Sequence, residues 1–531
     1  MDAFETLVDD FLTYHWTFHP VDASFAGARA YDANLPATDA GAPERHARAV
    51  GDLARDLAAA AVPADAAARL DARMMRARLA HVAALLERGM PYANPAWYTG
   101  EAAFGVISLV LGGRQGGDAR AMVERVGALP DFFAGAERHL RGRPAPADWC
   151  ARAAREANAL DRLLGAALHD EATFGRVPHR LVEMARCAVR GFAHALDDLP
   201  PCDAASGEAL LGLVMREVHG LAETPRELER RAAAAFERTL AELEAEAARL
   251  DPHLDWKAQI ANAARIAPPE RDALATYEAW NRRALAAAAD LVTPASKYGL
   301  TFAPLPPWAR DVAGDLYFLF YRSPAAYHPG EGSTYWVDVP AEPGDAPAPA
   351  HNTAAVKLVH AVHHGSIGHH TQNARARSAG STLARIAGTD CASGIAMLSA
   401  GTLVEGWACY AEDLLAEVPD FYTPAERLQL RYFELRNIAC ALADVRLHLG
   451  TWSLDEMRRF YRDDVLFAPS RIWSETTRNS MFPGSRLMYW CGSSQIAALR
   501  ARSPLGARAF HDALLSYGSA PVAWIGEEMF A

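Results

Sequence analysis

Cysteine is scarce in this sequence, and its spacing excludes the usual cysteine-built sites. Seven cysteines occur among 531 residues, and no two of them are spaced as C-x-x-C. An odd number of scattered cysteines argues against a disulfide framework and against a structural zinc ribbon. We therefore expect reduced thiols, as in the cytosol. The seven are Cys150, Cys187, Cys202, Cys391, Cys409, Cys440 and Cys491.

Long apolar runs and an excess of positive charge are also missing. No apolar run approaches the ~20 residues that a membrane-spanning helix requires. The N-terminal stretch MDAFETLVDDFLTYHW has acidic residues where a signal peptide has a basic start and then an apolar core. The net charge of −12, from 53 basic and 65 acidic residues, argues against a nucleic-acid partner, which needs a basic face. The sequence thus predicts a cytoplasmic protein that binds neither membrane nor nucleic acid.

Two frequent catalytic motifs are absent as well. The serine-rich segments CASGIAMLSAG and CGSSQIAALR lack the G-x-S-x-G spacing of a serine-hydrolase nucleophile. The glycines of LVLGGRQGGDAR are not followed by the Lys-Ser or Lys-Thr pair of a phosphate-binding loop. Neither a serine hydrolase nor a nucleotide enzyme is therefore expected.

Helical patterns dominate what is present. Apolar residues recur at three- and four-residue spacing with charged residues between them. Segment 224–251 opens with Thr-Pro, alternates charges at helical spacing and stops before a proline. Strand-like aromatic and β-branched residues gather near 314–340, around a turn rich in Pro and Gly. Other long helical patterns cover 119–142, 146–169, 179–197, 270–293, 424–450 and 504–518.

These patterns predict a large, mainly α-helical protein with a small β element near 314–340 and an internal cleft. No repeat with a period of about 20–50 residues is visible. We expect a single unit over residues 1–531, with two lobes as the alternative: a helical lobe over 1–300 and a site-bearing lobe over 301–531. The Pro-rich segment AEPGDAPAPAHNT is expected to be a loop that leads into the candidate site.

Five histidines gather within the stretch VHAVHHGSIGHHTQN, residues 359–373. His360 and His364 have the i, i+4 spacing that places two imidazoles on one helix face. His363 and His370 share a face, but on an unbroken helix they would stand about 10.5 Å apart, too far for one ion. A break at the glycines of this stretch would allow His369 or His370 to turn back toward His363. We therefore predict a metal site here rather than a solvated helix end.

A second helix, expected over 401–418, supplies carboxylates. Glu405 and Glu412 are seven residues apart and share one face, and the apolar residues around them indicate a largely buried helix. Because an unpaired buried carboxylate is costly, one of these glutamates is interpreted as a metal ligand and the other as a group that orients an imidazole. Two histidines and one carboxylate suit zinc or non-haem iron.

Several motifs together resemble a bacterial family known as domain of unknown function 885. HHGSIGHHTQ is similar to the family element H-E-x-x-P-G-H-H-x-Q, and EGWACYAEDLLAE to its E-G-W-A-x-Y-x-E. HPVDASFAGARAYDANLP, TYWVDVP, DVRLHLGTW, RNSMFPGSRLMYWCG and FHDALLSYGSAPV extend the resemblance over much of the chain. It implies a mostly helical fold related to zinc metallopeptidases of the gluzincin kind.

Carried over by position, the resemblance implies a ligand set for one divalent metal ion. The ligands would be His363, His369 and Glu405, with His370 as the alternative second imidazole. Zinc is the first expectation, and iron or copper are the alternatives. The substrate would be a small molecule or a short peptide, and the sequence is compatible with a homodimer.

The same resemblance implies catalytic residues in the C-terminal segment. The Tyr489 hydroxyl would donate to a developing oxyanion, and Arg478 would bind a substrate carboxylate. His448 is included with these catalytic candidates, and Asp444, one turn before it, would support this wall of the site. Without the motifs, each of these four would be interpreted as a structural residue.

One departure from the family pattern bears on the chemistry. The family has Glu directly after its first His, whereas this chain has His364. In a zinc hydrolase that Glu is the general base, worth about 10²–10⁴-fold in rate. Ile367 also replaces the family's proline, and Ser485-Arg486 replace a Gln-Ala pair.

Three hypotheses follow from this departure. His364 could act as the base of a hydrolase that cleaves an amide bond. His364 or His360 could instead be an additional ligand in a non-hydrolytic iron or copper enzyme of oxidative or lyase type. The third hypothesis is a metal-binding or metal-free pseudoenzyme. We order them as given, with a weak preference for hydrolysis.

Overall fold

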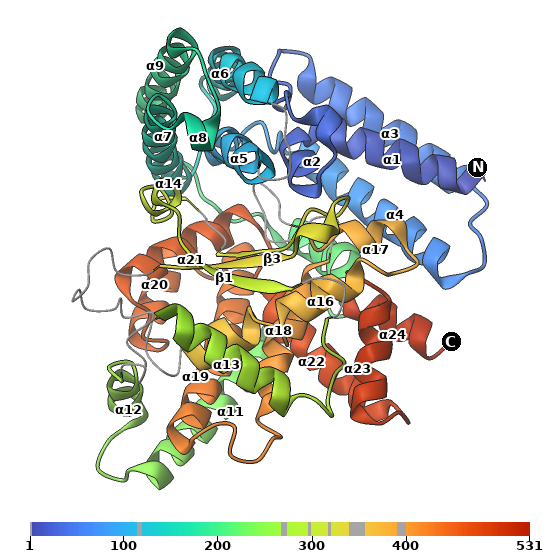
Figure 1. Ribbon diagram of the computed structural model, residues 1–531, viewed down its shortest axis with the longest axis vertical. Coiled ribbons are helices and arrows are strands. Elements are labelled where there is room, and N and C mark those ends of the chain that lie inside the picture. The colour runs from blue at the N-terminus through green and yellow to red at the C-terminus, as the bar shows by residue number, and fades with distance from the viewer. Residues whose placement is uncertain are drawn as a thin grey trace.

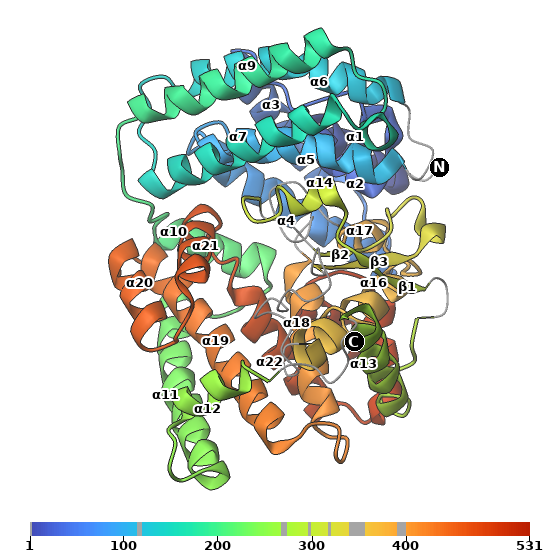
Figure 2. The same cartoon turned by 60° about the vertical axis from the view of Figure 1, so that its left-hand side comes forward.

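The computed structural model is mainly α-helical with one small β-sheet, as the sequence predicts (Figures 1 and 2). The Pro-rich loop expected at 341–353 falls outside the part of the chain that is described. Within that part, no helix is both long and apolar enough to cross a membrane. The described residues are 3–113, 119–266, 273–295, 299–316, 320–338, 356–389 and 400–531.

The N-terminal part of the chain is a stack of helices that lies at the top of Figure 1. They are α1 Ala3–Phe18, α2 Pro20–Ala26, α3 Ala42–Ala59, α4 Ala66–Leu86, α5 Pro95–Gly113, α6 Ala119–Leu140, α7 Ala147–Ala167, α8 Glu171–Phe174 and α9 His179–Ala195, with 3-10 turns at Arg29–Tyr31 and Leu196–Asp198. Helix α5 packs on α7, and α6 on α9, around an apolar core that includes Trp97, Phe133 and Leu160. Each helix can bury one face because its apolar residues recur at helical spacing.

The middle of the chain carries the longest helix of the described residues. The elements are α10 Glu208–Leu213, a π-helix η3 Val214–Val218, α11 Pro225–Leu250, α12 Trp256–Ala263 and α13 Ala273–Ala287. Helix α11 begins where the sequence predicts, because Thr224 caps it: its side chain accepts from the backbone N–H of Glu227, whose carboxylate accepts in return.

A small sheet lies between the N-terminal helices and the C-terminal half (Figure 1). Strands β1 Leu300–Pro304, β2 Tyr321–Arg322 and β3 Ser333–Val337 are arranged in the order β1-β3-β2, with β1 parallel and β2 antiparallel to β3. The short elements α14 Pro307–Arg310 and η4 Pro329–Glu331 join them. The predicted β element near 314–340 contains β2 and β3 but misses β1, whose sequence LTFAP has fewer aromatic and β-branched residues than the STYWV of β3.

The C-terminal half holds the candidate site. Its elements are the π-helix η6 Val356–His363, α16 His369–Ala376, α17 Thr382–Ile386, α18 Gly401–Leu415, α19 Pro424–His448, α20 Leu454–Asp463, α21 Pro469–Met481, α22 Leu487–Arg502, α23 Ala507–Ser516 and α24 Val522–Met529. Helix α18 packs closely on α22, and α11 packs on α19. The long helical patterns of the sequence correspond to α6, α7, α9, α13, α19 and α23.

One apolar core joins the two ends of the chain. It contains Phe11 of α1 and Met74 of α4 together with Trp407 of α18 and Trp524 of α24. The first helices of the N-terminal half thus share a core with the helices of the candidate site, while the division into two lobes stays a prediction.

Candidate metal centre

The histidine segment forms two helices joined by a tight turn. The π-helix η6 ends at His363 and α16 begins at His369, so the predicted break is confirmed. A Cβ atom on Gly365 would overlap the carbonyl oxygen of Ala361, and one on Gly368 would overlap that of His363. Only glycine permits the backbone to approach this closely at both positions. The turn therefore brings the first residue of α16 back toward the end of η6.

Helix α18 is fixed against this turn and against α22. The Trp407 indole N–H donates to the carbonyl of Ile367, in the turn, at 3.0 Å. On the preceding residue, a Cβ added to Gly406 would lie 2.6 Å from Gly492 of α22, so the two helices cross in backbone contact. The close crossing brings Glu405 next to the helix that carries Tyr489.

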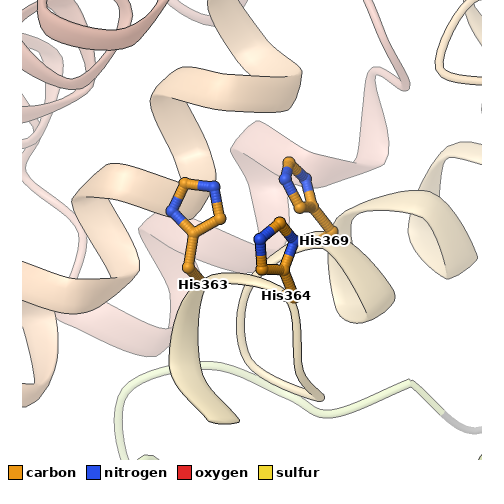
Figure 3. Close-up of side chains that lie close together, drawn as sticks. All are labelled: His363, His364 and His369. Carbon is orange, nitrogen blue, oxygen red and sulfur yellow. The ribbon is translucent and has the colours of Figure 1, made fainter. Parts of the chain in front are cut away.

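Two imidazoles and one carboxylate meet between the turn and α18. His363 Nε2 lies 3.5 Å from Glu405 Oε2, and His369 Nε2 lies 3.6 Å from the same oxygen. All three residues are buried, with exposed fractions of 8%, 6% and 5% for His363, His369 and Glu405. Figure 3 shows the rings of His363 and His369 on either side of that of His364. The structure therefore brings the three predicted ligands together.

The second nitrogen of His363 is held by Glu412, one of the predicted supporting residues. His363 Nδ1 donates to Glu412 Oε1 at 2.6 Å. Because Nδ1 is engaged by Glu412, Nε2 is the nitrogen that is directed at the side of Glu405. A carboxylate that orients an imidazole in this way is the usual outer partner of a metal-bound histidine.

Sequence reasoning missed Cys409 at this place. His363, Cys409 and Glu412 form a second group of donor atoms that lie within 4.8 Å of one another. Cys409 follows Glu405 by four residues, so the same helical spacing that singled out Glu412 could have identified it. Burial raises the pKa of its thiol to about 12, even though His363 acts in the opposite direction.

The buried carboxylates of the site favour a positive charge beside them. Burial alone would raise the pKa of Glu405, but the hydrogen bond with His363 and the charges of His369, His363 and Arg478 lower it to about 2. Burial alone would lower the pKa of His363, but hydrogen bonds with Cys409, Glu405 and Glu412 raise it well above the usual value. Glu405 is thus ionised at neutral pH, in a site that favours a cation beside it.

His364 lies in the same cluster but has a different environment. Its ring centroid is 4.8 Å from that of His363 and 5.4 Å from that of His369, and the three offer donor atoms within 4.8 Å of one another. Burial, then the neighbouring histidines, lower its pKa well below the usual value. Its Nδ1 is buried, and no described residue bonds to it. His364 is therefore a neutral imidazole with one unused nitrogen.

The two alternative histidines are held elsewhere, by the sheet. The ring of His360 is hydrogen-bonded to the Tyr335 hydroxyl on β3. His370 Nδ1 and the hydroxyl of Ser333, on the same strand, are 3.0 Å apart. Because β3 engages both, the structure groups His369 and not His370 with His363.

Arg478 interacts electrostatically with Glu405, and Tyr489 lies beside Arg478, so these two residues form a wall of polar side chains. Arg478 Nη1 lies 3.5 Å from the Tyr489 hydroxyl. The structure adds Arg486, whose guanidinium lies 5.0 Å from the Tyr489 ring and forms a salt bridge with Glu475. Arg486 occupies one of the positions that depart from the family pattern, which is the only sequence signal for it.

His448 and Asp444 are fully buried behind this wall. His448 Nδ1 accepts from the backbone N–H of Ser206 at 3.1 Å, and its Nε2 donates to the carbonyl of Asn479 at 2.8 Å. Asp444 accepts from the backbone N–H groups of Gly484 at 3.0 Å and Arg486 at 2.9 Å. Both nitrogens of His448 are thus used by backbone groups, one of them in α21, whereas Asp444 holds the turn before α22.

The donor set fits a divalent metal ion. Two ligands of a tetrahedral zinc ion, with bonds of about 2.0–2.2 Å, stand about 3.4 Å apart. The separations of 3.5 and 3.6 Å to Glu405 match that value. Nitrogen and carboxylate donors also suit zinc and iron by chemical type. A cation among these three residues would satisfy the geometry and the charge of the site.

Comparison with known proteins identifies the family. The profile of the family described as "Bacterial protein of unknown function (DUF885)" matches residues 20–529. The chain belongs to this family. No match was found among curated proteins.

Two solved structures share the fold of this DUF885 protein. One is described as a "putative lipoprotein of unknown function" from Shewanella oneidensis, with a TM-score of 0.78 at 17% identity over 100% of both chains. The other is described as a "putative lipoprotein" from Colwellia psychrerythraea, with a TM-score of 0.66 at 15% identity, covering 99% of this chain and 98% of that one. At these identities the similarity establishes the fold.

These structures contradict the predicted cytoplasmic location. Both are described as lipoproteins, a class of proteins attached to a membrane by a lipid. The prediction was wrong because it rested on scattered cysteines, an acidic N-terminal stretch and the lack of a long apolar run, and none of these features excludes attachment by a lipid.

Proposed function

We propose that this protein is a metal-dependent hydrolase, with zinc as the first candidate, that cleaves an amide bond in a short peptide or amino-acid derivative. One observation carries the proposal. Two buried imidazole nitrogens lie 3.5 and 3.6 Å from one carboxylate oxygen, while a second carboxylate holds the outer nitrogen of the first imidazole at 2.6 Å. Histidine, histidine and glutamate around one point form the ligand set of many catalytic zinc sites.

Each residue of the site has a distinct role in this proposal. His363, His369 and Glu405 would hold the ion, which polarises the substrate carbonyl and makes water a better nucleophile at neutral pH. His364, through its unused Nδ1, accepts a proton from the attacking water and passes it to the leaving nitrogen. The Tyr489 hydroxyl donates to the oxygen on which negative charge develops.

The family relationship supports this assignment only in part. HHGSIGHHTQ and EGWACYAEDLLAE resemble gluzincin-type elements, with His364 in place of the glutamate that serves as base. A histidine at that position changes the base, because its neutral form is the proton acceptor. Slower hydrolysis and a narrower substrate range are expected.

The experiment is a hydrolysis assay with a mixture of short peptides and N-acyl amino acids, analysed by mass spectrometry. Pairs of products whose masses add up to that of a substrate plus one water molecule should appear, disappear with a chelator and return with zinc. Tyr489→Phe should lower kcat by about 10²-fold, the cost of one lost oxyanion donor, with little change in KM. Tyr517→Phe, at the end of α23, is the matched control. Full activity in Tyr489→Phe would remove Tyr489 from the mechanism, and chelator-resistant activity would refute a metal hydrolase.

A second function is favoured by the position of His364. Its donor atom lies within 4.8 Å of those of His363 and His369, so it could serve as a third imidazole ligand. Three imidazoles and a carboxylate suit iron or copper and non-hydrolytic chemistry on a small molecule. The variant His364→Glu distinguishes the two functions. Bound zinc together with a rise in peptidase activity in the variant supports hydrolysis. Stoichiometric iron or copper in the native protein that is lost in the variant supports the second function.

A further inference from the structure

A cavity of about 380 Å³ lies where α7 of the N-terminal half meets α21 of the C-terminal half (Figure 2). Arg152, Glu156 and Thr477 line it and are buried, whereas Arg155 and Ser470 line it and are exposed. The cavity therefore extends from a buried end to an end that is open to solvent. None of its described lining residues is a candidate metal ligand.

On the side of α7, the carboxylate of Asp315 is shared by two guanidinium groups. Arg155 Nη2 lies 3.1 Å from Asp315 Oδ1, and Arg162 Nη2 lies 2.5 Å from Oδ2. Burial alone would raise the pKa of Asp315, but hydrogen bonds with Arg162 and Arg155 lower it. At the buried end, Arg152 and Glu156 form an ion pair at 2.7 Å. Through these contacts, this side of the cavity carries more positive than negative charge.

On the side of α21, the carboxylate of Glu475 is shared in the same way. Its Oε1 lies 3.1 Å from Arg471 Nη2, and its Oε2 accepts from Arg486 Nε at 2.6 Å. Arg436 of α19 adds a further guanidinium. Burial, then the charge of Arg471, lowers the pKa of Arg436 to about 10. Arg436 thus stays charged at neutral pH and adds to the positive potential at Arg471.

The lining residues of α21 place a row of hydroxyl groups between two arginines. Three hydroxyl side chains follow one another at helical spacing along the wall of the cavity, at Ser470, Ser474 and Thr477. By helical period, Arg471 lies on one side of this row and Trp473 on the other. The Arg155 guanidinium lies over the Trp473 ring, 4.3 Å from its centroid. Arg155 and Arg471 therefore approach the same row from opposite sides.

The buried end of the cavity has a hydroxyl that is not used within the described part of the chain. Thr477 is 1% exposed, and no described residue bonds to its Oγ1. A hydroxyl can donate to an anionic oxygen. The wall thus combines positive charge at its sides with a polar inner end.

A guanidinium presents a planar fork that matches the two oxygens of a carboxylate or a phosphate. Two such forks border this cavity, whose volume lies in the range of small-molecule pockets, about 300–1,000 Å³. We propose that the cavity binds a small anionic ligand by its carboxylate or phosphate group, between Arg155 and Arg471. The site is separate from the metal centre and does not depend on the proposed hydrolysis.

A ligand in this position would contact both halves of the chain, because Arg155 belongs to α7 and Arg471 to α21. It would also offset the positive charge that the shared carboxylates leave unbalanced. Binding should therefore raise the melting temperature of the native protein.

Calorimetric titration of the purified full-length protein tests the proposal, with inorganic phosphate and succinate as separate titrants. The native protein should bind at least one of them, and the tighter titrant identifies the preferred oxyanion. Arg155→Gln and Arg471→Gln should each weaken binding by about tenfold or more, the loss expected for charge-assisted hydrogen bonds. Arg459→Gln, exposed on α20, is the matched control and should bind like the native protein.

A lysine variant and a variant of the metal centre make the outcome decisive. Arg471→Lys keeps the charge but not the planar fork, so it should bind more weakly than the native protein, and it replaces Arg471→Gln if that variant does not fold. Glu405→Gln should bind the anion as the native protein does. Binding that is lost in Glu405→Gln but kept in Arg471→Gln would assign the anion to the metal centre and overturn the proposal. No binding of either titrant to the native protein, or equal affinities in Arg471→Gln and Arg459→Gln, would overturn it as well.

Discussion

At the scale of single residues, His363 connects two carboxylates through its two ring nitrogens. Nδ1 donates to Glu412, and Nε2 is directed at the side of Glu405 where His369 also lies. This division fixes the tautomer that a metal ligand requires. Glu412 is thus expected to act on metal affinity through His363 rather than by contact with the ion.

Glu412→Gln should weaken zinc binding by about 10–100-fold, because the imidazole loses its charged outer partner. The amide oxygen of glutamine can still accept from Nδ1, so the ring should keep its orientation. Competition with a chromophoric chelator measures the affinity. Glu417→Gln, exposed just beyond α18, is the control. Equal zinc affinity in Glu412→Gln and the native protein would show that Glu412 does not support the site.

At the scale of elements, the site depends on the crossing of α18 and α22. Gly406 and Gly492 meet at backbone distance, and Trp407 ties α18 to the turn between η6 and α16. The glycines of the EGWACYAEDLLAE and RNSMFPGSRLMYWCG motifs therefore have a packing role. They bring Glu405 and Tyr489 to the same place.

Gly492→Ala should destabilise the protein, because the added Cβ would overlap the Thr402 carbonyl oxygen and lie 2.9 Å from the Gly406 Cα. Overpacking of this kind costs about 1–3 kcal/mol, and backbone neighbours cannot rotate away. Urea denaturation measures the loss. Gly506→Ala is the control, because a Cβ there meets nothing within 4 Å. Equal denaturation midpoints for Gly492→Ala and Gly506→Ala would show that the crossing tolerates a side chain.

Local patterns in the sequence were sufficient to predict the helices and much of the site. The face shared by Glu405 and Glu412 follows from helical period, and the break in the histidine segment follows from Gly365 and Gly368. The grouping of His369 rather than His370 with His363 depends on β3, which engages His370 and His360 from a distant segment. Contacts of this kind leave no local pattern. The role of Arg486 escaped prediction for the same reason, because its contact with Glu475 joins two different helices.

At the scale of the whole molecule, the N-terminal half is attached to the site-bearing half by buried polar contacts as well as by the shared core. Asp71 of α4 accepts from the Ser381 hydroxyl at 2.6 Å and from the backbone N–H groups of Leu383 at 2.8 Å and Thr382 at 3.1 Å. These donors lie at the N-terminus of α17, where a carboxylate is stabilising. Asp71 thus joins α4 to the segment that follows the histidines.

Asp71→Ala should lower the free energy of unfolding by about 3 kcal/mol, because it leaves buried donors without an acceptor. Chemical denaturation followed by circular dichroism measures the change. Asp56→Ala, exposed on α3, should have little effect. Similar stability of the two variants would mean that the halves are joined by apolar packing alone.

The central claim is that His363, His369 and Glu405 hold one metal ion, and metal content measures it most directly. Protein purified without a nickel column should contain one equivalent of metal by mass spectrometry, with zinc as the expected element. The double variant with His363→Ala and Glu405→Ala should contain none, whereas His370→Ala, whose imidazole faces β3, should retain it. An unchanged metal content in the double variant would contradict the account, because the ion would then be bound elsewhere.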